Sequence, residues 1–379
     1  MTSRERVLAA FRHREPDRTP FFEKLIKSPV ADEVLGRPCA ASNWGHRMER
    51  LAEGDWEGLM QQEARDLVDL AKVLGMDCVR LYPNELPPAE LPKRLGPDTW
   101  QIGGTIAERL ASGWIRHRPV EPQPPVAPEQ AEQSLRHSLD AEYCPPQFAD
   151  ESLVVWRAVQ RLSQDEGLDL ACFAAAYTMG AATLPPYLFE WFVRDRESLR
   201  RYYERNALVG RDLGLLLARE GADIVALGGD LACDHGPVIS PADYREFIMP
   251  GIRLQSRALH EVGAFTTNAS DGNLWPILRD FLLGAEVDGF EEIDIVAGMD
   301  LTRLKAELGD RITFVGNMDI RHLLTSGTVE QAREATFRCL DAGRPNGGHL
   351  LMSSNCIHES VKTELFMACV AAYRKYFGL

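Results

Sequence analysis

Short apolar runs alternate with longer stretches of helical periodicity along most of the chain. The runs are rich in β-branched and aromatic residues and end in polar residues, which predicts buried strands. Between them, apolar residues return every three or four positions, as from Tyr187 to Gly221, which predicts helices. Strands that alternate with helices favour a parallel sheet. The predicted strands are residues 18–23, 76–82, 169–175, 222–228, 263–268, 287–293, 311–317 and 349–354.

Eight strand and helix units are the number at which a parallel sheet closes into a barrel. We therefore predict an α/β fold, a (β/α)8 TIM barrel that occupies residues 1–379 as a single domain. A helix is expected to precede the barrel, because Thr2 and Glu5 have the spacing of a capping box. Ser240 followed by Pro241, and Thr328 with Gln331, mark the starts of two later helices.

One long segment interrupts this alternation. Residues 83–168, between the second and third predicted strands, contain two proline-rich stretches that do not suit barrel helices. We interpret the segment as an insertion over the mouth of the barrel, with a hairpin near Thr99 to Val120.

Charge and composition narrow the possible partners. The formal charge is −14, and basic residues are interleaved with acidic ones, so nucleic acid is not expected as a partner. No apolar run approaches the roughly 20 residues that cross a bilayer, and the charged amphipathic start lacks a signal-peptide core. We expect a cytoplasmic protein that is not in a membrane. The eight cysteines include no CxxC pair, and Cys233 and Cys356 lie in polar loops.

The candidate active site follows from the barrel prediction, because the carboxyl ends of barrel strands meet at one face. Asp230, Asp271 and Glu23 are the candidate catalytic residues, since positioned carboxyl groups serve as general acids and bases. The candidate substrate-binding residues are Arg80, Tyr82, Tyr177, His235, Asn268, Ser270, Asn273, Asn317, Ser353 and Asn355.

Several neighbouring polar residues have simpler interpretations. Strand alternation predicts that only one of Glu291 and Glu292 faces the centre. Asp300 and Asp319 each precede a helical pattern and are expected to cap helices. His260 lies in a helical stretch and is expected at the surface or packed there.

A metal site is not favoured by the sequence. The stretch LGGDLACDHGP places Asp230, Cys233, Asp234 and His235 close together, but adjacent Asp and His side chains rarely point at one ion. If a metal is bound, the expected ligands are Asp271, His235 and Cys356. The G-x-S-x-G, Walker, G-x-G-x-x-G and H-E-x-x-H motifs are missing, which disfavours hydrolase and phosphoryl-transfer chemistry.

Five segments resemble the uroporphyrinogen decarboxylase superfamily, in order over nearly the whole chain. They are MTSRERVLAAFRHREPDRTP, GPVISPADYREFIMP, SDGNLWPIL, AGMDLTRLKAELGDRITFVGNMDIRHLLTSGTVEQA and GGHLLMSSNCIH. The resemblance implies a (β/α)8 barrel and one of two activities: decarboxylation of tetrapyrroles, or corrinoid-dependent methyl transfer.

The family's own motifs then separate its branches. The decarboxylases carry an arginine-rich loop after the first strand, where this chain reads FFEKLIKSP with Glu23 and Lys24. The methyltransferases that use zinc carry His-x-Cys after the fifth strand, where this chain has Ala269, Ser270 and Asp271, and only Cys356 lies near their third ligand. Zinc lowers the pKa of a thiol, and these replacements do not supply that chemistry.

The resemblance therefore points to a corrinoid-dependent methyltransferase without a thiolate zinc site. Such an enzyme moves a methyl group between a corrinoid and a small acceptor or donor such as tetrahydrofolate. A separate carrier protein is expected to hold the corrinoid, because the chain lacks a D-x-H-x-x-G motif. Side chains such as Asn268, Asp271 and Asn273 suit a pterin-like ring. Two alternatives remain: a lyase for a small carboxylate, held by Arg80 or Lys24, and a binding barrel without chemistry.

Overall fold

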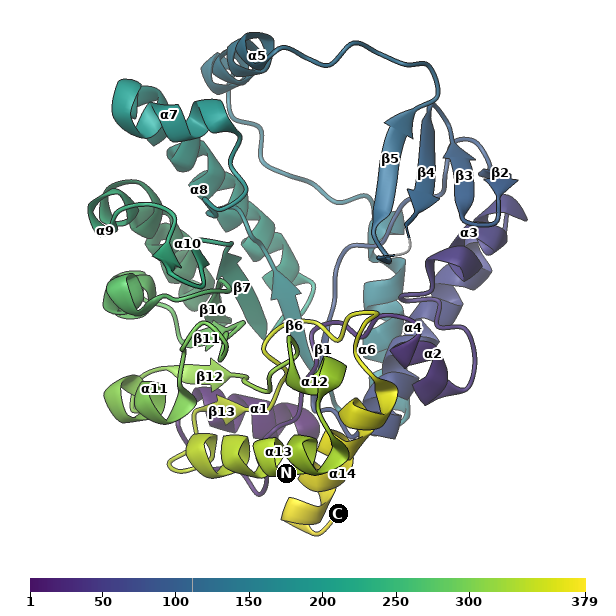
Figure 1. The fold of residues 1–379 in the computed structure, drawn as a ribbon, viewed down its shortest axis with the longest axis vertical. Helices are drawn as coiled ribbons and strands as arrows, with labels where there is room; N and C mark the ends of the chain where they lie inside the picture. The colour runs from purple at the N-terminus through teal and green to yellow at the C-terminus, as the bar shows by residue number, and fades with distance from the viewer. Residues whose placement is uncertain (111) are drawn as a thin grey trace.

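Seven parallel strands form the central sheet of the computed structural model, which describes residues 1–110 and 112–379 (Figure 1). The sheet curls, and every neighbouring pair of strands runs parallel. Seven of the eight predicted strands are present, so the prediction of a parallel α/β barrel architecture is confirmed in part. In sheet order they are β1 (Cys78–Arg80), β6 (Ala171–Ala175), β7 (Ile224–Gly228), β10 (Phe265–Ala269), β11 (Gly289–Glu291), β12 (Thr313–Val315) and β13 (His349–Leu350).

The predicted first strand, residues 18–23, does not form, and this part of the prediction is wrong. The segment makes a single bridge, between Phe21 and Leu351, and the carbonyl of Pro20 accepts from Leu351 N at 2.9 Å. On its other side, Phe21 accepts a hydrogen bond from Asp77 N at 2.7 Å. The segment therefore bonds to both ends of the sheet. Pro20 has no N–H group, which limits the hydrogen bonds that a ladder needs.

Helices surround the sheet, and their starts carry the expected caps. Thr2 and Glu5 form the predicted capping box of α1, and Thr328 with Gln331 forms that of α13. The long predicted helix from residue 187 is broken in two at Asp195, whose carboxylate accepts from Ser198 N and starts α8. The described helices of eight residues or more outside residues 83–168 are α1 (Ser3–Phe11), α3 (Trp44–Ala52), α4 (Trp56–Leu74), α7 (Pro186–Arg194), α8 (Arg196–Arg219), α10 (Met249–Glu261), α11 (Leu301–Leu308), α13 (Val329–Gly343) and α14 (Thr363–Phe377).

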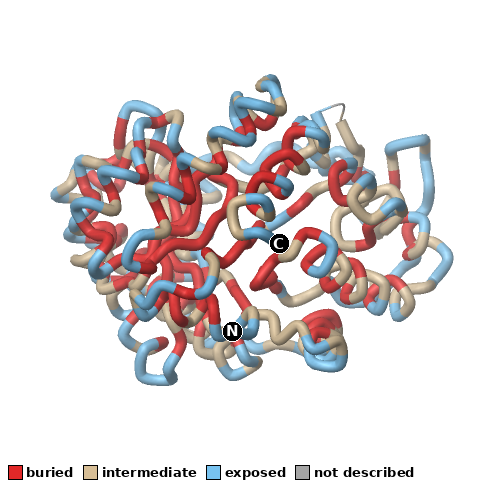
Figure 2. Tube along the Cα trace, turned by 90° about the horizontal axis from the view of Figure 1, so that it is seen from below, coloured by how far each residue is buried: buried red, intermediate tan, exposed pale blue. Residues whose placement is uncertain are grey.

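Helix α1 closes the amino-terminal end of the sheet. Val7 and Phe11 join a buried cluster that includes Phe22 and Phe173, whose rings stack at 5.1 Å. Buried residues follow the central strands in Figure 2. Side chains therefore fill the interior at the amino-terminal end of the sheet, and space for a ligand is left at the carboxyl ends of the strands.

The interruption between β1 and β6 contains a separate four-stranded antiparallel sheet in the order β2, β3, β4 and β5. Its β3, β4 and β5 extend the predicted hairpin. The segment was expected to contain no barrel helix, but α6 (Val154–Asp165) packs against α4 in the helix layer. The insertion therefore ends earlier than predicted. Its remaining elements are β2 (Lys93–Gly96), β3 (Thr99–Ile102), β4 (Thr105–Arg109), β5 (Ile115–Pro119) and α5 (Pro128–Asp140).

No helix in the described part of the chain has both the length and the apolar character that a membrane crossing requires.

Candidate functional site

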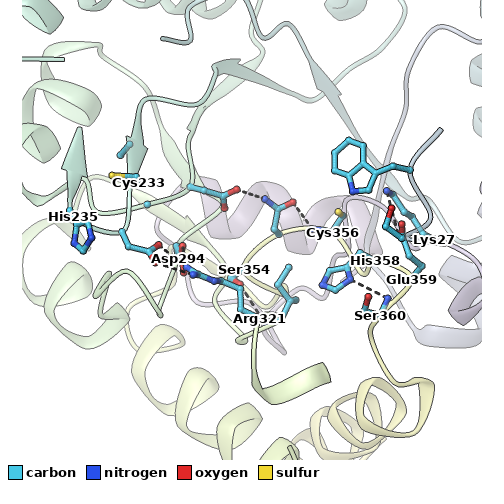
Figure 3. A pocket seen from close by; sticks show the side chains of 18 residues that line it. Lys27, Cys233, His235, Asp294, Arg321, Ser354, Cys356, His358, Glu359 and Ser360 are labelled. Carbon is cyan, nitrogen blue, oxygen red and sulfur yellow. Dashed lines mark hydrogen bonds and ion pairs between the residues drawn. The ribbon is translucent and has the colours of Figure 1, made fainter. Parts of the chain in front are cut away.

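A cavity of about 850 Å³ lies at the carboxyl ends of the strands (Figure 3). The loops that follow β7, β10, β11, β12 and β13 all contribute to its lining, as the barrel frame predicts. Trp114, from the insertion, adds to the wall. Of the residues predicted for the site, the lining contains His235, Asp271 and Asn355, and also Cys356, which was named only as a ligand if a metal is bound.

Asp271 is the titratable group best placed for chemistry in this cavity. Its Oδ2 accepts a hydrogen bond of 2.6 Å from Asn355 Nδ2. Burial, together with repulsion from Glu292, raises the pKa of Asp271 to about 7. A carboxyl group with such a pKa is able to accept or donate a proton at neutral pH.

Asp230 and Glu292 lie beside Asp271. One oxygen from each of the three carboxyl groups lies within 4.8 Å of the others. Glu292 is ion-paired with Lys24, and both side chains are nearly buried. Asp230 and Glu292 also line an adjoining cavity of about 320 Å³ with Tyr177.

Close backbone packing fixes the position of Asp230. Gly229 has a φ of 136°, and a Cβ atom there would lie 3.0 Å from Gly180 N. The carbonyl of Asp230 accepts hydrogen bonds of 2.8 Å from Ala181 N and Ala182 N. The two loops therefore approach more closely than a larger residue at position 229 would permit.

The structure does not bring together the three residues named as ligands in case a metal is bound, Asp271, His235 and Cys356. Among the described residues, the group of metal-binding side chains that converges is Asp230, Asp271 and Glu292, without His235 or Cys356. Cys233 and His235 lie across the cavity from Cys356 and His358 in Figure 3. Burial raises the pKa of Cys356, which favours the thiol over the thiolate. These residues do not fit a zinc thiolate centre.

Both Glu291 and Glu292 face the interior, contrary to the prediction for this pair. Glu291 ends β11, and Glu292 has a φ of 64° in the left-handed region. Strand alternation stops where the backbone leaves the extended conformation, so two successive side chains reach the same side.

Glu291 forms a buried ion pair with Arg80. Their atoms Oε2 and Nη2 lie 2.5 Å apart, and neither side chain is exposed. Tyr177 accepts from Arg80 Nη1 at 2.8 Å and donates to Glu291 Oε1 at 3.2 Å, and Thr267 also donates to Oε1. The guanidinium group lies 4.4 Å from the centre of the Phe173 ring. Arg80 and Tyr177, both predicted to bind substrate, therefore bond to each other and to Glu291 in this structure.

Glu23 is buried beneath this region and bonds to Ser353. Its Oε1 accepts from Ser353 N at 3.0 Å, and its Oε2 lies 2.6 Å from Ser353 Oγ. Burial raises the pKa of Glu23 to about 8, against the opposing effect of these hydrogen bonds. Glu23 also lines a small, mostly apolar cavity of about 110 Å³ with Tyr82 and Arg80.

Four predicted binding residues serve the scaffold in the structure. Asn268 donates to Phe281 O at 2.8 Å, and Asn317 donates to Met299 O at 3.1 Å, which directs both amides towards the helix layer. Ser270 Oγ accepts from Leu231 N, and Asn273 Oδ1 accepts from Trp275 N in a turn. Side chains alternate along strands and cap turns, and sequence spacing did not reveal which of these positions point inward.

The expectations for Asp300, Asp319 and His260 are confirmed. Asp300 and Asp319 accept backbone hydrogen bonds at helix starts, and His260 lies at the surface beside Asp288. Sequence reasoning missed Arg321, which binds Asp234 at 2.7 Å and Asp294 at 3.2 Å across the cavity. No motif marks this arginine, because its partners lie on two other loops.

The chain is similar to one known protein family and to several solved structures. A family model described as Uroporphyrinogen decarboxylase (URO-D) matches residues 139–376. The chain is similar to a methyltransferase from Methanosarcina mazei, with a TM-score of 0.63 and 18% identity over 100% of this chain and 99% of that one. A xylanase from Gloeophyllum trabeum has a TM-score of only 0.38 and 11% identity, over 60% of this chain and 81% of that one. No curated protein sequence matches.

Proposed function

Because the chain belongs to the uroporphyrinogen decarboxylase family, we propose that it is a corrinoid-dependent methyltransferase of that family. It moves a methyl group between a corrinoid, held by a separate carrier protein, and a small acceptor or donor such as tetrahydrofolate. It works without a thiolate zinc site. The Methanosarcina mazei methyltransferase, which matches over the full length of both chains, supports this choice at the level of the fold.

One observation carries the preference for methyl transfer over tetrapyrrole decarboxylation. Four cations around the cavities are each paired with a carboxylate of the chain: Lys24 with Glu292, Arg80 with Glu291, Arg321 with Asp234, and Lys27 with Glu359. A substrate with many carboxylates would have to displace these partners at the cost of leaving charges unpaired. The reacting pterin ring of tetrahydrofolate is neutral and makes no such demand, because the two carboxylates of that molecule lie on the tail remote from the ring.

Asp271 is the residue that we assign to proton transfer. It lines the cavity, and its pKa of about 7 allows exchange of a proton with a reacting nitrogen or oxygen. Asn355 orients one carboxyl oxygen, so the other is left for the ligand. The corrinoid supplies the methyl group or removes it.

The experiment is an optical assay of methylcobalamin demethylation with tetrahydrofolate and thiols as acceptors. We expect demethylation with at least one acceptor, and a loss of roughly 100-fold or more in Asp271→Asn. Asp310→Asn is the matched control, because Asp310 is exposed and lies outside the cavity lining. Equal rates with and without wild-type protein for every acceptor would refute the proposal.

The lyase alternative has less support. Its expected anion partners, Arg80 and Lys24, are already engaged with Glu291 and Glu292. Release of carbon dioxide from small carboxylates by the same preparation, measured by mass spectrometry, would favour it.

A further inference from the structure

The four-stranded sheet of the insertion differs in charge from the rest of the molecule. Residues 93–119 contain five basic residues against Asp98 and Glu108, a net charge of +3, whereas the whole chain carries −14. The segment is therefore a basic patch on an acidic protein. The basic residues are Lys93, Arg94, Arg109, Arg116 and Arg118.

Three of these cations share one face of the sheet. Lys93 lies opposite Gln101, which lies opposite Ile106, which lies opposite Arg118. Side chains directly across a sheet point the same way, and alternate residues along β5 do so too, which adds Arg116 to this face. All three cations are exposed, but Arg116 is ion-paired at 2.6 Å with Glu108, which lies opposite it on the same face.

The opposite face packs on the molecule. Trp100 lies one position from Gln101 and is 4% exposed, within the main hydrophobic core. Arg94, on the same side as Trp100, reaches Glu49 of α3 at 3.4 Å. The cationic face is therefore the outward one, and in the described part of the chain Lys93 and Arg118 form no ion pair.

The sheet also reaches the mouth of the cavity. Trp114, between β4 and β5, lines the cavity and is 73% exposed. Its ring centre lies 5.8 Å from Lys27 Nζ. Trp114 therefore places one end of the sheet at the wall of the cavity, within reach of a protein that is bound on the sheet.

We propose that this face, defined by Lys93, Arg116 and Arg118, is the docking surface for an acidic corrinoid carrier protein. The inference rests on the proposed function, which requires a carrier to bring its corrinoid to the cavity. Opposite charge speeds the encounter and orients the partner. Nucleic acid fits less well, because the −14 charge of the chain repels a long polyanion beyond this patch.

The test measures binding by calorimetry, with the full chain and a methylcobalamin-loaded corrinoid carrier protein from the same organism. The variant is Lys93→Glu with Arg118→Glu. Its matched control is Arg161→Glu with Lys375→Glu, which makes the same charge change at exposed helical positions. We expect roughly tenfold or greater weakening in the first variant only, and weaker wild-type binding at high salt.

Free methylcobalamin separates this inference from the proposed function. Demethylation of free methylcobalamin should be equal in the wild type and both variants, because Lys93 and Arg118 lie outside the cavity lining. If free methylcobalamin reacts but the carrier binds both variants equally, or does not bind the wild type, the docking surface is wrong. Tight binding of a duplex DNA or RNA oligonucleotide that depends on Lys93 and Arg118 would also overturn it.

Discussion

Glu23 Oε2 lies 2.6 Å from Ser353 Oγ, which itself lies 2.5 Å from the carbonyl oxygen of Asn355. A hydroxyl group has one proton, so it donates to only one of these two oxygens. Both contacts are hydrogen bonds if Glu23 carries a proton and donates it to Ser353. The geometry therefore agrees with the raised pKa of Glu23, about 8, and indicates a neutral carboxylic acid at neutral pH.

Replacement of this acid by its amide should change how stability depends on pH. The pKa of Glu23 is raised from 4.5 to about 8, so between these values the folded state holds a proton that the unfolded state has lost. Its contribution to stability is full below pH 4.5 and declines as pH rises towards 8, by about 1.4 kcal/mol per pH unit. In Glu23→Gln this slope should be missing. Urea unfolding of both proteins between pH 4.5 and 8 gives the free energy of unfolding at each pH. Equal slopes of this free energy against pH in the two proteins would contradict the prediction.

Removal of one partner from the buried ion pair of Arg80 and Glu291 should destabilise the folded protein. Glu291→Ala leaves a buried guanidinium group unpaired, so we expect a loss of about 3–5 kcal/mol in the free energy of unfolding. The double variant Arg80→Met with Glu291→Leu should lose less than Glu291→Ala. Arg194→Ala, in an exposed pair with Glu190, is the control and should change stability by about 0–1 kcal/mol. A similar small change in Glu291→Ala would refute this account.

Glu292 should tune the proton affinity of Asp271. Its charge contributes to the raised pKa of Asp271, so Glu292→Gln should lower that pKa from about 7. Carbon NMR of labelled aspartate side chains follows the titration directly. Glu307→Gln, on the exposed surface of α11, should leave it unchanged. An unaltered Asp271 titration in Glu292→Gln would show that the two carboxyl groups do not interact.

Zinc removal should leave the proposed activity intact. The carboxyl groups that converge are those of Asp230, Asp271 and Glu292. Cys356 is not part of this group, and the pKa of its thiol is raised. We therefore expect Cys356→Ser and chelator-treated protein to retain methyl transfer. One equivalent of zinc by elemental analysis, lost in Cys356→Ser together with activity, would contradict the account without a zinc thiolate.

The strand pattern of the sequence located the sheet because buried parallel strands read as short apolar runs. It failed at residues 18–23, where apolar residues and a proline suit a strand end as well as a strand. It also failed at Asp195, since helical periodicity continues across the break and only the capping geometry reveals it.

The candidate site was harder to predict than the sheet. Asp230 and Asp271 were predicted for the site because each follows a strand of the barrel, whereas the sequence did not decide which of Glu291 and Glu292 faces the centre. Asn268 and Asn317 also end strands, yet their amides serve the helix layer, and only the register of the sheet decides between these outcomes. Arg321 and Trp114 come from loops, where sequence carries no periodic signal.

The most direct test of the proposed function is to follow the methyl group itself. The protein is incubated with ¹³C-methylcobalamin and tetrahydrofolate, and in parallel with a carboxylated porphyrinogen, with methylated product and carbon dioxide measured by NMR and mass spectrometry. The account predicts label on the acceptor, its loss in Asp271→Asn, and no carbon dioxide. Carbon dioxide release from the porphyrinogen without methyl transfer would contradict it.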